Sequence, residues 1–358
     1  MLEKALKGTR KYWTWITFLF LVIIFGMSAY SQQRWFGLTV TGMDRNVSWG
    51  LYRAQLTFLV AIAASAMIVV LPYSLHNFKA FGKIVIISEF LAASATLMCL
   101  LFVLADMGRP DRMLNVLLYP HFHSTMFWDL LALNCNLFIS LIIGWALLGA
   151  ERKEVLPPTW VKPVIYLSFP LVIGMLTVTA ILHGGLPYHN LWFPAAFIPR
   201  FLVSSFASGA SLLILLALIL KKTTGFEVGS EAREKLAVVA TYAGATHFFL
   251  IGTDFFTVCY SNPVPWMWFS LMIGLGSVAV LLIPALRTSS KCLSAACAGL
   301  VISVWLNNGV GYEMIEYSPT LLEITITLGI WAIGVLLLTI LLKVAVTVKG
   351  ELSHCVLK

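Results

Sequence analysis

Apolar runs of about 20 residues, each long enough to cross a bilayer as an α-helix, recur along almost the whole chain. Only 11% of its 358 residues are charged and 59% are hydrophobic. In soluble domains about a quarter of the residues are charged, so this composition excludes a sizeable soluble domain. The sequence therefore predicts an all-α integral membrane protein.

We predict ten transmembrane helices, because ten apolar runs are separated by short polar loops. The expected ranges are 13–31, 51–75, 83–105, 126–148, 162–183, 199–220, 234–260, 264–286, 291–308 and 320–345. The first run follows a basic segment but lacks a small-residue cleavage site, so we expect it to be retained as a span.

The basic residues indicate how the chain is oriented. Eighteen of the 24 Lys and Arg residues fall at the termini or in the loops on one side, and six fall on the other. The positive-inside rule then places both termini in the cytoplasm and the loop 105–125 outside. Orientation accounts for the net charge of +8, and we expect the bilayer rather than nucleic acid as the partner.

The cysteines and histidines do not predict a metal centre. The six cysteines are scattered, without a C-x-x-C pair, and this excludes the usual iron–sulfur and zinc frameworks. A b-type haem needs two histidines at matching depth, and only His247 lies well inside a span. We therefore expect no metal or haem in this chain.

Three ionisable residues fall near the outer ends of different predicted spans. Asp129 lies about one turn below the outer interface, His183 ends its span, and Asp254 lies roughly 9 Å from the end of another. A charge inside a membrane costs several kcal/mol unless it is paired or faces water. Because the three lie at similar depth, we expect them to share a polar pocket.

Two further residues indicate a proton pathway. His247 is seven residues before Asp254 and hence on the same helical face. Glu89 lies about one turn inside the inner end of its span, where it serves either a proton route or the membrane interface. Asp129 also has a simpler interpretation as a helix cap.

Small residues repeat at four-residue spacing in the span 199–220, as Ser204 with Ser208 and Ser205 with Gly209. Small side chains allow membrane helices to approach one another closely. We expect this face to pack against another helix.

Several motifs, each weak by itself, form a specific combination. The first group is Asp106-Met-Gly-Arg-Pro110, Arg112, Pro120 and Ser124-Thr-Met126, and Trp49-Gly50 opens an earlier span. The second group is His183-Gly-Gly185, Trp192, Pro194, Pro199 and Phe201 to Ala210. Together these motifs, over residues 48–212, resemble the NrfD/polysulfide-reductase family of membrane subunits.

The ten spans resemble the branch of that family found in the DsrMKJOP and Hmc-type complexes of sulfate reducers, and in particular its DsrP-like subunits. This resemblance implies two four-helix bundles plus flanking helices. The implied division is a flanking helix at 13–31, a first bundle at 51–183, a second bundle at 199–286 and C-terminal helices at 291–345.

The resemblance also implies a function. Such subunits lie in the cytoplasmic (inner) membrane, bind neither haem nor flavin, and exchange electrons between menaquinone and an iron–sulfur, ferredoxin-like partner on the outer face. The implied complex also contains a cytochrome c and other membrane subunits. Its implied role is anaerobic respiration linked to sulfite or sulfate reduction, with proton translocation.

A quinol loses two protons together with its two electrons, so its site needs a hydrogen-bond partner for each hydroxyl and a path for the protons. Buried carboxylates and histidines are suited to this chemistry. We expect Asp254 and His183 to bracket the quinone head group, with Asp129 as a third catalytic residue.

Two polar residues at the outer start of the span 51–75, Tyr52 and Gln55, are further candidates to bind the quinone. The charged outer loop, with Asp106, Arg109 and Arg112, is expected to cover the pocket and to dock the electron-transfer partner.

Two other function classes remain open. A secondary transporter predicts inverted repeats and helices broken near the bilayer midplane. A passive anchor for a redox complex predicts that the outer loop is needed but that Asp254 and His183 are not.

Overall fold

A computed structural model describes residues 8–43, 50–76, 78–155, 157–184, 194–258, 265–310 and 317–355. Within these ranges it does not describe the side chains of residues 117, 183–184, 194–197, 254–258, 265–267, 309–310 and 349–355. The described residues form helices and no strand. Nine helical segments among them are long and apolar enough to cross a membrane, and one apolar helix is shorter. The prediction of an all-α integral membrane protein with about ten spanning helices is confirmed.

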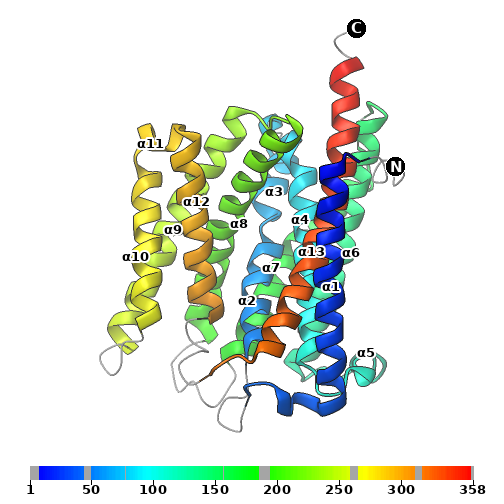
Figure 1. Cartoon of the computed structure of the whole chain (residues 1–358). Helices are drawn as coiled ribbons and strands as arrows, with labels where there is room; N and C mark the ends of the chain where they lie inside the picture. The colour runs from blue at the N-terminus through cyan, green and yellow to red at the C-terminus, as the bar shows by residue number, and fades with distance from the viewer. Residues whose placement is uncertain are drawn as a thin grey trace.

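The helices run nearly side by side from one end of the molecule to the other (Figure 1). The long helices are α1 (Arg10–Phe36), α4 (Gly82–Asp106), α6 (Thr125–Arg152), α7 (Val161–Gly184), α8 (Pro194–Thr224), α9 (Ser230–Val258), α10 (Pro265–Leu282), α12 (Ser290–Trp305) and α13 (Leu321–Cys355). The remaining span consists of α2 (Leu51–Ala64) and α3 (Met67–Leu75). The short elements used below are α5 (Asn115–Leu118) and the π-helix η5 (Leu306–Val310).

Two groups of four helices lie next to one another. The first consists of α2–α3, α4, α6 and α7, and the second consists of α8, α9, α10 and α12 (Figure 1). Helices α1 and α13 pair with each other and pack on the first group through α4. The grouping differs from the implied division in one respect, because α12 packs on α8 and α10 rather than with α13.

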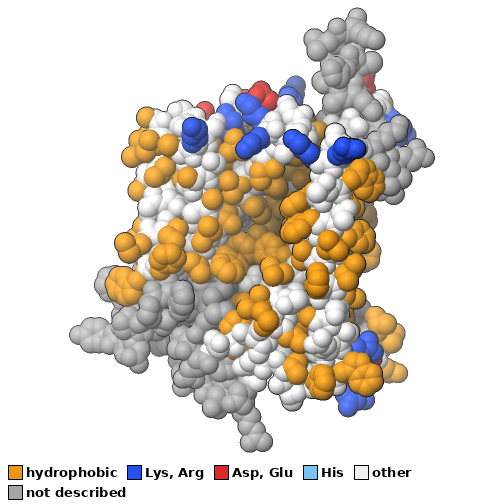
Figure 2. Space-filling model, in the orientation of Figure 1, with side chains coloured by type: hydrophobic (Ala, Val, Ile, Leu, Met, Phe, Trp, Pro, Cys, Tyr) orange, Lys and Arg blue, Asp and Glu red, His pale blue; other side chains and the backbone are white. Residues whose placement is uncertain are grey.

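Helix α1 begins at the same end of the molecule at which α13 finishes, whereas α5 lies at the opposite end (Figure 1). Lys and Arg side chains gather along the first of these ends, and a smaller basic group lies at the other (Figure 2). We call the end that carries α5 the outer end, in keeping with the orientation expected from the loop charges.

The central element is α2. All 14 of its residues are buried, and it contacts α4, α7, α8, α13 and η5. A helix that is apolar around its whole circumference is stable only when other helices surround it. The few polar residues of α2 are therefore buried as well. Each of them needs a hydrogen-bond or charge partner from a neighbouring element.

Helix α2 passes into α3 through a short tightened turn at Ser65 and Ala66. The N–H of Ser65 bonds the carbonyl of Ile62 at 3.0 Å, and the N–H of Ile68 bonds the carbonyl of Ser65 at 3.1 Å. Such three-residue spacing replaces the α-helical pattern over one turn. Helix α8 approaches this turn closely, since a Cβ on Gly209 would overlap the Cβ of Ser65.

The close approach at Gly209 confirms the prediction that the small-residue face of this span packs against another helix. A similar contact joins α1 and α13, where a Cβ on Gly26 would lie 2.6 Å from the Cα of Gly329. Helix association in membranes depends on such packing because lipid provides no hydrophobic drive.

We predict that Gly209→Ala destabilises the protein by about 1–3 kcal/mol, the usual cost of overpacking a tight interface. The matched control is Gly174→Ala in α7, where an added Cβ would meet no atom within 4 Å. Thermal unfolding of the purified protein in detergent should show a lower midpoint for the first variant alone. Equal midpoints would contradict the tight contact between α8 and α2.

Candidate functional site

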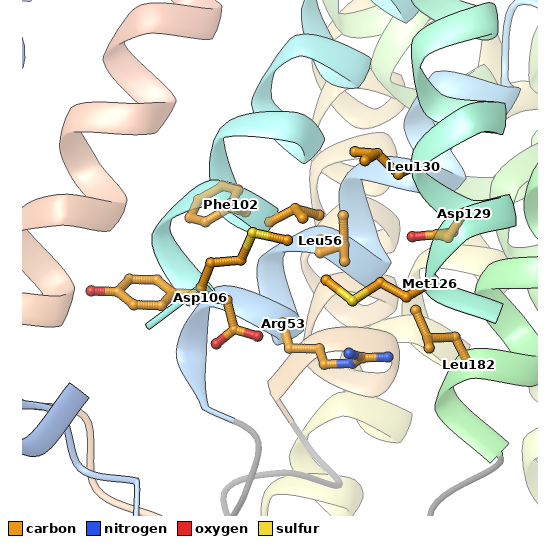
Figure 3. Close-up of a pocket in the computed structure, with 11 residues that line it drawn as sticks. Arg53, Leu56, Phe102, Asp106, Met126, Asp129, Leu130 and Leu182 are labelled. Carbon is orange, nitrogen blue, oxygen red and sulfur yellow. The ribbon is translucent and has the colours of Figure 1, made fainter. Parts of the chain in front are cut away.

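A cavity of about 100 Å³ lies at the outer end of the first helix group. It is formed by α2, α4, α6 and the last turns of α7. Its walls are mostly apolar, and its charged groups are few (Figure 3). The lining residues are Tyr52, Arg53, Leu56, Phe102, Val103, Asp106, Met107, Met126, Asp129, Leu130 and Leu182. An apolar cavity with a few convergent polar groups is typical of a small-molecule site.

Arg53 is the charged centre of the cavity. It is only 9% exposed, and its guanidinium interacts electrostatically with the carboxylates of Asp106 and Asp129. Figure 3 shows its side chain extending across the cavity, with the two aspartates on either side of the view. A buried arginine in a membrane needs such partners, because an unpaired charge there is costly.

Sequence reasoning did not select Arg53. The charge count groups it with the six basic residues on the outer side, whereas the structure places it in the first turn of α2, where it is buried. The available signal was its position within the apolar span 51–75, two residues before Gln55. A basic residue at that depth indicates a paired or functional group rather than a loop charge.

Asp129 lies in the second turn of α6 and is 3% exposed. The Thr179 hydroxyl of α7 donates a hydrogen bond of 2.6 Å to its carboxylate. Asp129 is thus held in the wall of the cavity by a neighbouring helix. Its place in the second turn of α6 agrees with the expectation that it lies about one turn from the outer end of its span.

Asp106 differs from the expectation that it forms part of a docking surface. It is the last residue of α4, and its side chain lines the cavity near Arg53 (Figure 3). Its side chain lies on the side of α4 that faces the cavity. The chain leaves the helix directly after Asp106. Arg109 and Arg112, the two other docking candidates, are exposed. The loop and the cavity are therefore adjacent but distinct.

Tyr52 lines the cavity, but its hydroxyl bonds outward to the flanking helix. It donates a 2.6 Å hydrogen bond to Oε1 of Gln33 in α1, and the amide of Gln33 donates to the carbonyl of Ala105 at 2.7 Å. Since a carbonyl can only accept, Ala105 fixes the orientation of the Gln33 amide and hence the direction of the Tyr52 proton. A direct hydrogen bond from Tyr52 to a quinone carbonyl would require this arrangement to break.

Gln55 is buried and joins three helices. Its side-chain oxygen accepts hydrogen bonds of 3.1 Å from the indole N–H groups of Trp305 in α12 and Trp331 in α13. Next to it, Asn308 of η5 donates a 2.7 Å bond to the Ser204 hydroxyl of α8. The structure thus gives Gln55 a bridging role between the two helix groups and α13.

The start of α13 closes the outer end of α2. Glu323 accepts hydrogen bonds from the N–H groups of Thr320, at 2.8 Å, and Gly42, at 3.0 Å. The Thr320 hydroxyl accepts in return from the N–H of Glu323 at 3.3 Å, which completes a capping box. The Tyr317 hydroxyl donates to Glu323 and accepts from the N–H of Leu51. Burial, followed by the bond to Glu323, raises the pKa of Tyr317, so its hydroxyl remains a donor.

The two leading catalytic candidates, His183 and Asp254, have side chains outside the described residues. His183 directly follows Leu182, which lines the cavity on α7. Helix α9, which carries Asp254, packs on α8 and α10 and contributes no described residue to the cavity. Their assignment to the quinone site stays a prediction.

His247 lies in the second helix group. It is fully buried on α9, beside the backbone and the guanidinium of Arg200 in α8. Glu89, the other candidate for a proton pathway, is buried in the first group, where the Ser140 hydroxyl lies near its carboxyl. The structure therefore does not bring His247 and Glu89 together.

Polar residues follow one face of α6 from the outer cavity toward Glu89. Asp129, Asn136 and Ser140 are spaced by seven and four residues, so they share a face about 16 Å long. Asn136 donates a 2.9 Å hydrogen bond to Thr96 of α4. A cavity of about 10 Å³, enough for one water molecule, adjoins Glu89, Asn136 and Ser140.

The fold and the site together define the class of protein: a multi-pass membrane protein with a cavity at one end in which buried charged side chains converge. Residues 39–355 match the sequence profile of the polysulphide reductase NrfD family. The chain therefore belongs to this family of integral membrane subunits.

Three relatives extend the comparison. A candidate membrane subunit of a dimethyl sulfoxide reductase from Halobacterium salinarum is 24% identical, over 90% of this chain and 88% of its own. A selenate reductase subunit from Mesobacillus selenatarsenatis is 22% identical over 92% of each chain. A 22% identical match covers 57% of this chain and 50% of an Hdr-like menaquinol oxidoreductase integral membrane subunit of Archaeoglobus fulgidus.

We predict that Gln55→Leu lowers stability, because it leaves two indole N–H groups without their acceptor, at about 1–3 kcal/mol for each buried donor. The matched control is Gln32→Leu, since Gln32 is exposed on α1. Tryptophan fluorescence during thermal unfolding should show a lower midpoint for the first variant alone. An unchanged midpoint combined with loss of quinone binding would instead make Gln55 a quinone ligand.

Proposed function

We propose that this chain is the quinone-interacting membrane subunit of a respiratory oxidoreductase complex. The observation that carries the proposal is the outer cavity, in which Arg53 lies between Asp106 and Asp129 within apolar walls. The names of the three relatives agree with a membrane subunit of a reductase or oxidoreductase complex. The name of the archaeal Hdr-like relative includes menaquinol, and we propose menaquinone as the exchangeable substrate here as well.

The chemistry of the lining residues fits a quinone head group. A guanidinium donates hydrogen bonds and suits a carbonyl oxygen, so Arg53 is the proposed donor. The carboxylates of Asp129 and Asp106 accept hydrogen bonds and protons, and they suit the hydroxyl groups of a quinol. Leu56, Phe102 and the neighbouring apolar residues would hold the ring and exclude water. In this proposal His183, next to the cavity on α7, is a further proton acceptor.

Electrons from the quinol need an acceptor outside this chain. We propose an iron–sulfur, ferredoxin-like partner that docks on the outer face, where Arg109 and Arg112 are exposed beside the cavity. A cytochrome c, further membrane subunits and a link to sulfite or sulfate reduction belong to the same proposal. They rest on the resemblance to the DsrP-like branch.

The proposed location is the cytoplasmic membrane, with both termini in the cytoplasm. The concentration of Lys and Arg side chains at the end where α1 begins supports this orientation (Figure 2). The cavity then faces the opposite side of the membrane, together with the loop that carries Arg109 and Arg112.

We predict that Asp129→Asn lowers quinol-linked turnover by roughly 100-fold or more, the range for a lost acid–base group. Asparagine has the same shape and keeps an oxygen that can accept from Thr179, so the complex should still assemble. The measurement is oxidation of a short-chain naphthoquinol by the purified complex with a soluble one-electron acceptor. The control is Glu227→Gln, a carboxylate near the inner-side Lys221 with which it pairs. Unchanged turnover in Asp129→Asn would contradict the proposed site.

The parallel variant Asp254→Asn separates the two possible locations of the chemistry. If α9 takes part in the site, this variant also loses turnover while the complex remains assembled. If the outer cavity of the first helix group is sufficient, only Asp129→Asn loses turnover. A passive anchor would tolerate both changes, and a secondary transporter would show no stoichiometric menaquinone in solvent extracts of the complex.

A second proposed activity is proton translocation through the first helix group. The polar face of α6 and the water-sized cavity beside Glu89 support a route from the inner side toward Asp129. His247 would serve a separate branch in the second helix group, because α9 packs on α8 and α10 rather than on α6.

We predict that Glu89→Gln lowers the number of protons translocated for each quinol oxidised, while turnover itself is maintained. The carboxyl that can release a proton is lost, but the amide keeps an oxygen that can accept a hydrogen bond from the nearby Ser140 hydroxyl. The measurement uses the complex in proteoliposomes with a pH-sensitive dye, and Glu227→Gln again serves as the control. An unchanged proton yield would exclude Glu89 from the route.

A further inference from the structure

A second cavity of about 10 Å³ lies between the end of α1 and the loop after α4. It is lined by Tyr30, Gln33, Arg34, Met107 and their neighbours. Its volume matches a single water molecule, and its polar lining offers that water hydrogen-bond partners. It lies at the outer end of the molecule. The cavity of about 100 Å³ that we propose to bind quinone, called the quinone cavity below, lies at the same end.

The Tyr30 hydroxyl makes this small cavity a candidate site for a bound water molecule. Its oxygen is buried and forms no hydrogen bond within the described part of the chain. Buried hydroxyl groups are nearly always paired, with protein or with ordered water. Because Tyr30 lines the cavity, a water molecule there would supply the missing partner.

The small cavity adjoins the quinone cavity. Met107 lines both cavities, and its flexible thioether side chain is well suited to moving between them. Tyr52, in the wall of the quinone cavity, donates its hydrogen bond to Gln33, in the wall of the small one. These side chains form the boundary between the two spaces.

On its other side the small cavity meets the outer surface. Arg34 lines the cavity and forms a 2.5 Å ion pair with Asp111, and both side chains are more than half exposed. Polar groups therefore extend from the quinone cavity to the surface along the last turns of α1.

We propose that protons exchange between the quinone cavity and the outer surface through this small cavity, past the Gln33 amide, by way of the Tyr30 hydroxyl and the Arg34–Asp111 ion pair. The inference rests on the proposed quinone chemistry. Oxidation of one quinol releases two electrons to the iron–sulfur partner and two protons, and these protons are the ones that leave by this route. In quinone reduction the same protons enter by it.

The roles of the residues differ along the route. The hydroxyl of Tyr30 and the water beside it can relay protons, because each both donates and accepts. The amide of Gln33 orients the Tyr52 hydroxyl, and Met107 lies in the wall that the two cavities share. Tyr30, Gln33 and Arg34 lie on α1, which precedes the residues 39–355 that match the family profile.

The test uses Tyr30→Phe and Gln33→Leu in the purified complex, with Gln32→Leu as the matched control on the exposed face of α1. We expect Tyr30→Phe to lower kcat for short-chain naphthoquinol oxidation by at least about tenfold, as for a lost proton-transfer group. Gln33→Leu should lower kcat as well, because an apolar side chain replaces the polar wall of the small cavity. Their solvent deuterium isotope effect should rise, because proton exchange becomes rate-limiting. Binding of the naphthoquinol should stay unchanged, and the control should match the unmodified complex.

A route that does not use α1 gives an unchanged kcat and isotope effect in both variants, and this result would overturn the proposal. Tyr30→Phe keeps the ring and removes one unpaired hydroxyl, so it tests the route even if Gln33→Leu fails to assemble. The failure of the proposed function is a different result: Asp129→Asn would then also leave turnover unchanged.

Discussion

The charge of Arg53 inside the most buried helix is the constraint on which the outer half of the protein depends. A guanidinium cannot remain unpaired in the hydrocarbon region, so α4 and α6 bring Asp106 and Asp129 to it from two sides. These contacts fix the outer ends of three helices relative to one another. The cavity lies among these three groups and is otherwise lined mostly by apolar side chains.

The position of α2 imposes further conditions on its neighbours. Every side chain of α2 is buried, so each polar group needs a partner from another helix. Gln55 accepts from Trp305 and Trp331, which ties α12 and α13 to the centre of the molecule. At the turn that follows α2, only a glycine at position 209 allows α8 to approach Ser65 as closely as it does. The packing at Gly209 and the hydrogen bonds at Gln55 therefore favour the same arrangement of helices around α2.

The flanking pair α1 and α13 contributes more than a lipid-facing surface. Gln33 of α1 bonds both Tyr52 and the carbonyl of Ala105, and the capping box of α13 holds Tyr317 against the start of α2. Both helices therefore support the outer end of α2 and α4, where the charged cavity lies. This arrangement connects elements at the two ends of the sequence to a site built mainly from residues 52–182.

The sequence by itself determined the membrane fold and the approximate spans, because hydropathy and helical rise depend only on local composition. It also identified Asp129 and the small-residue face at Gly209. Only the tertiary structure decided which charges meet: it placed Arg53 between two aspartates, turned Asp106 inward, and put Glu89 and His247 in different helix groups. Such pairings depend on how the helices rotate and pack against one another, and the pattern along a single chain does not specify that.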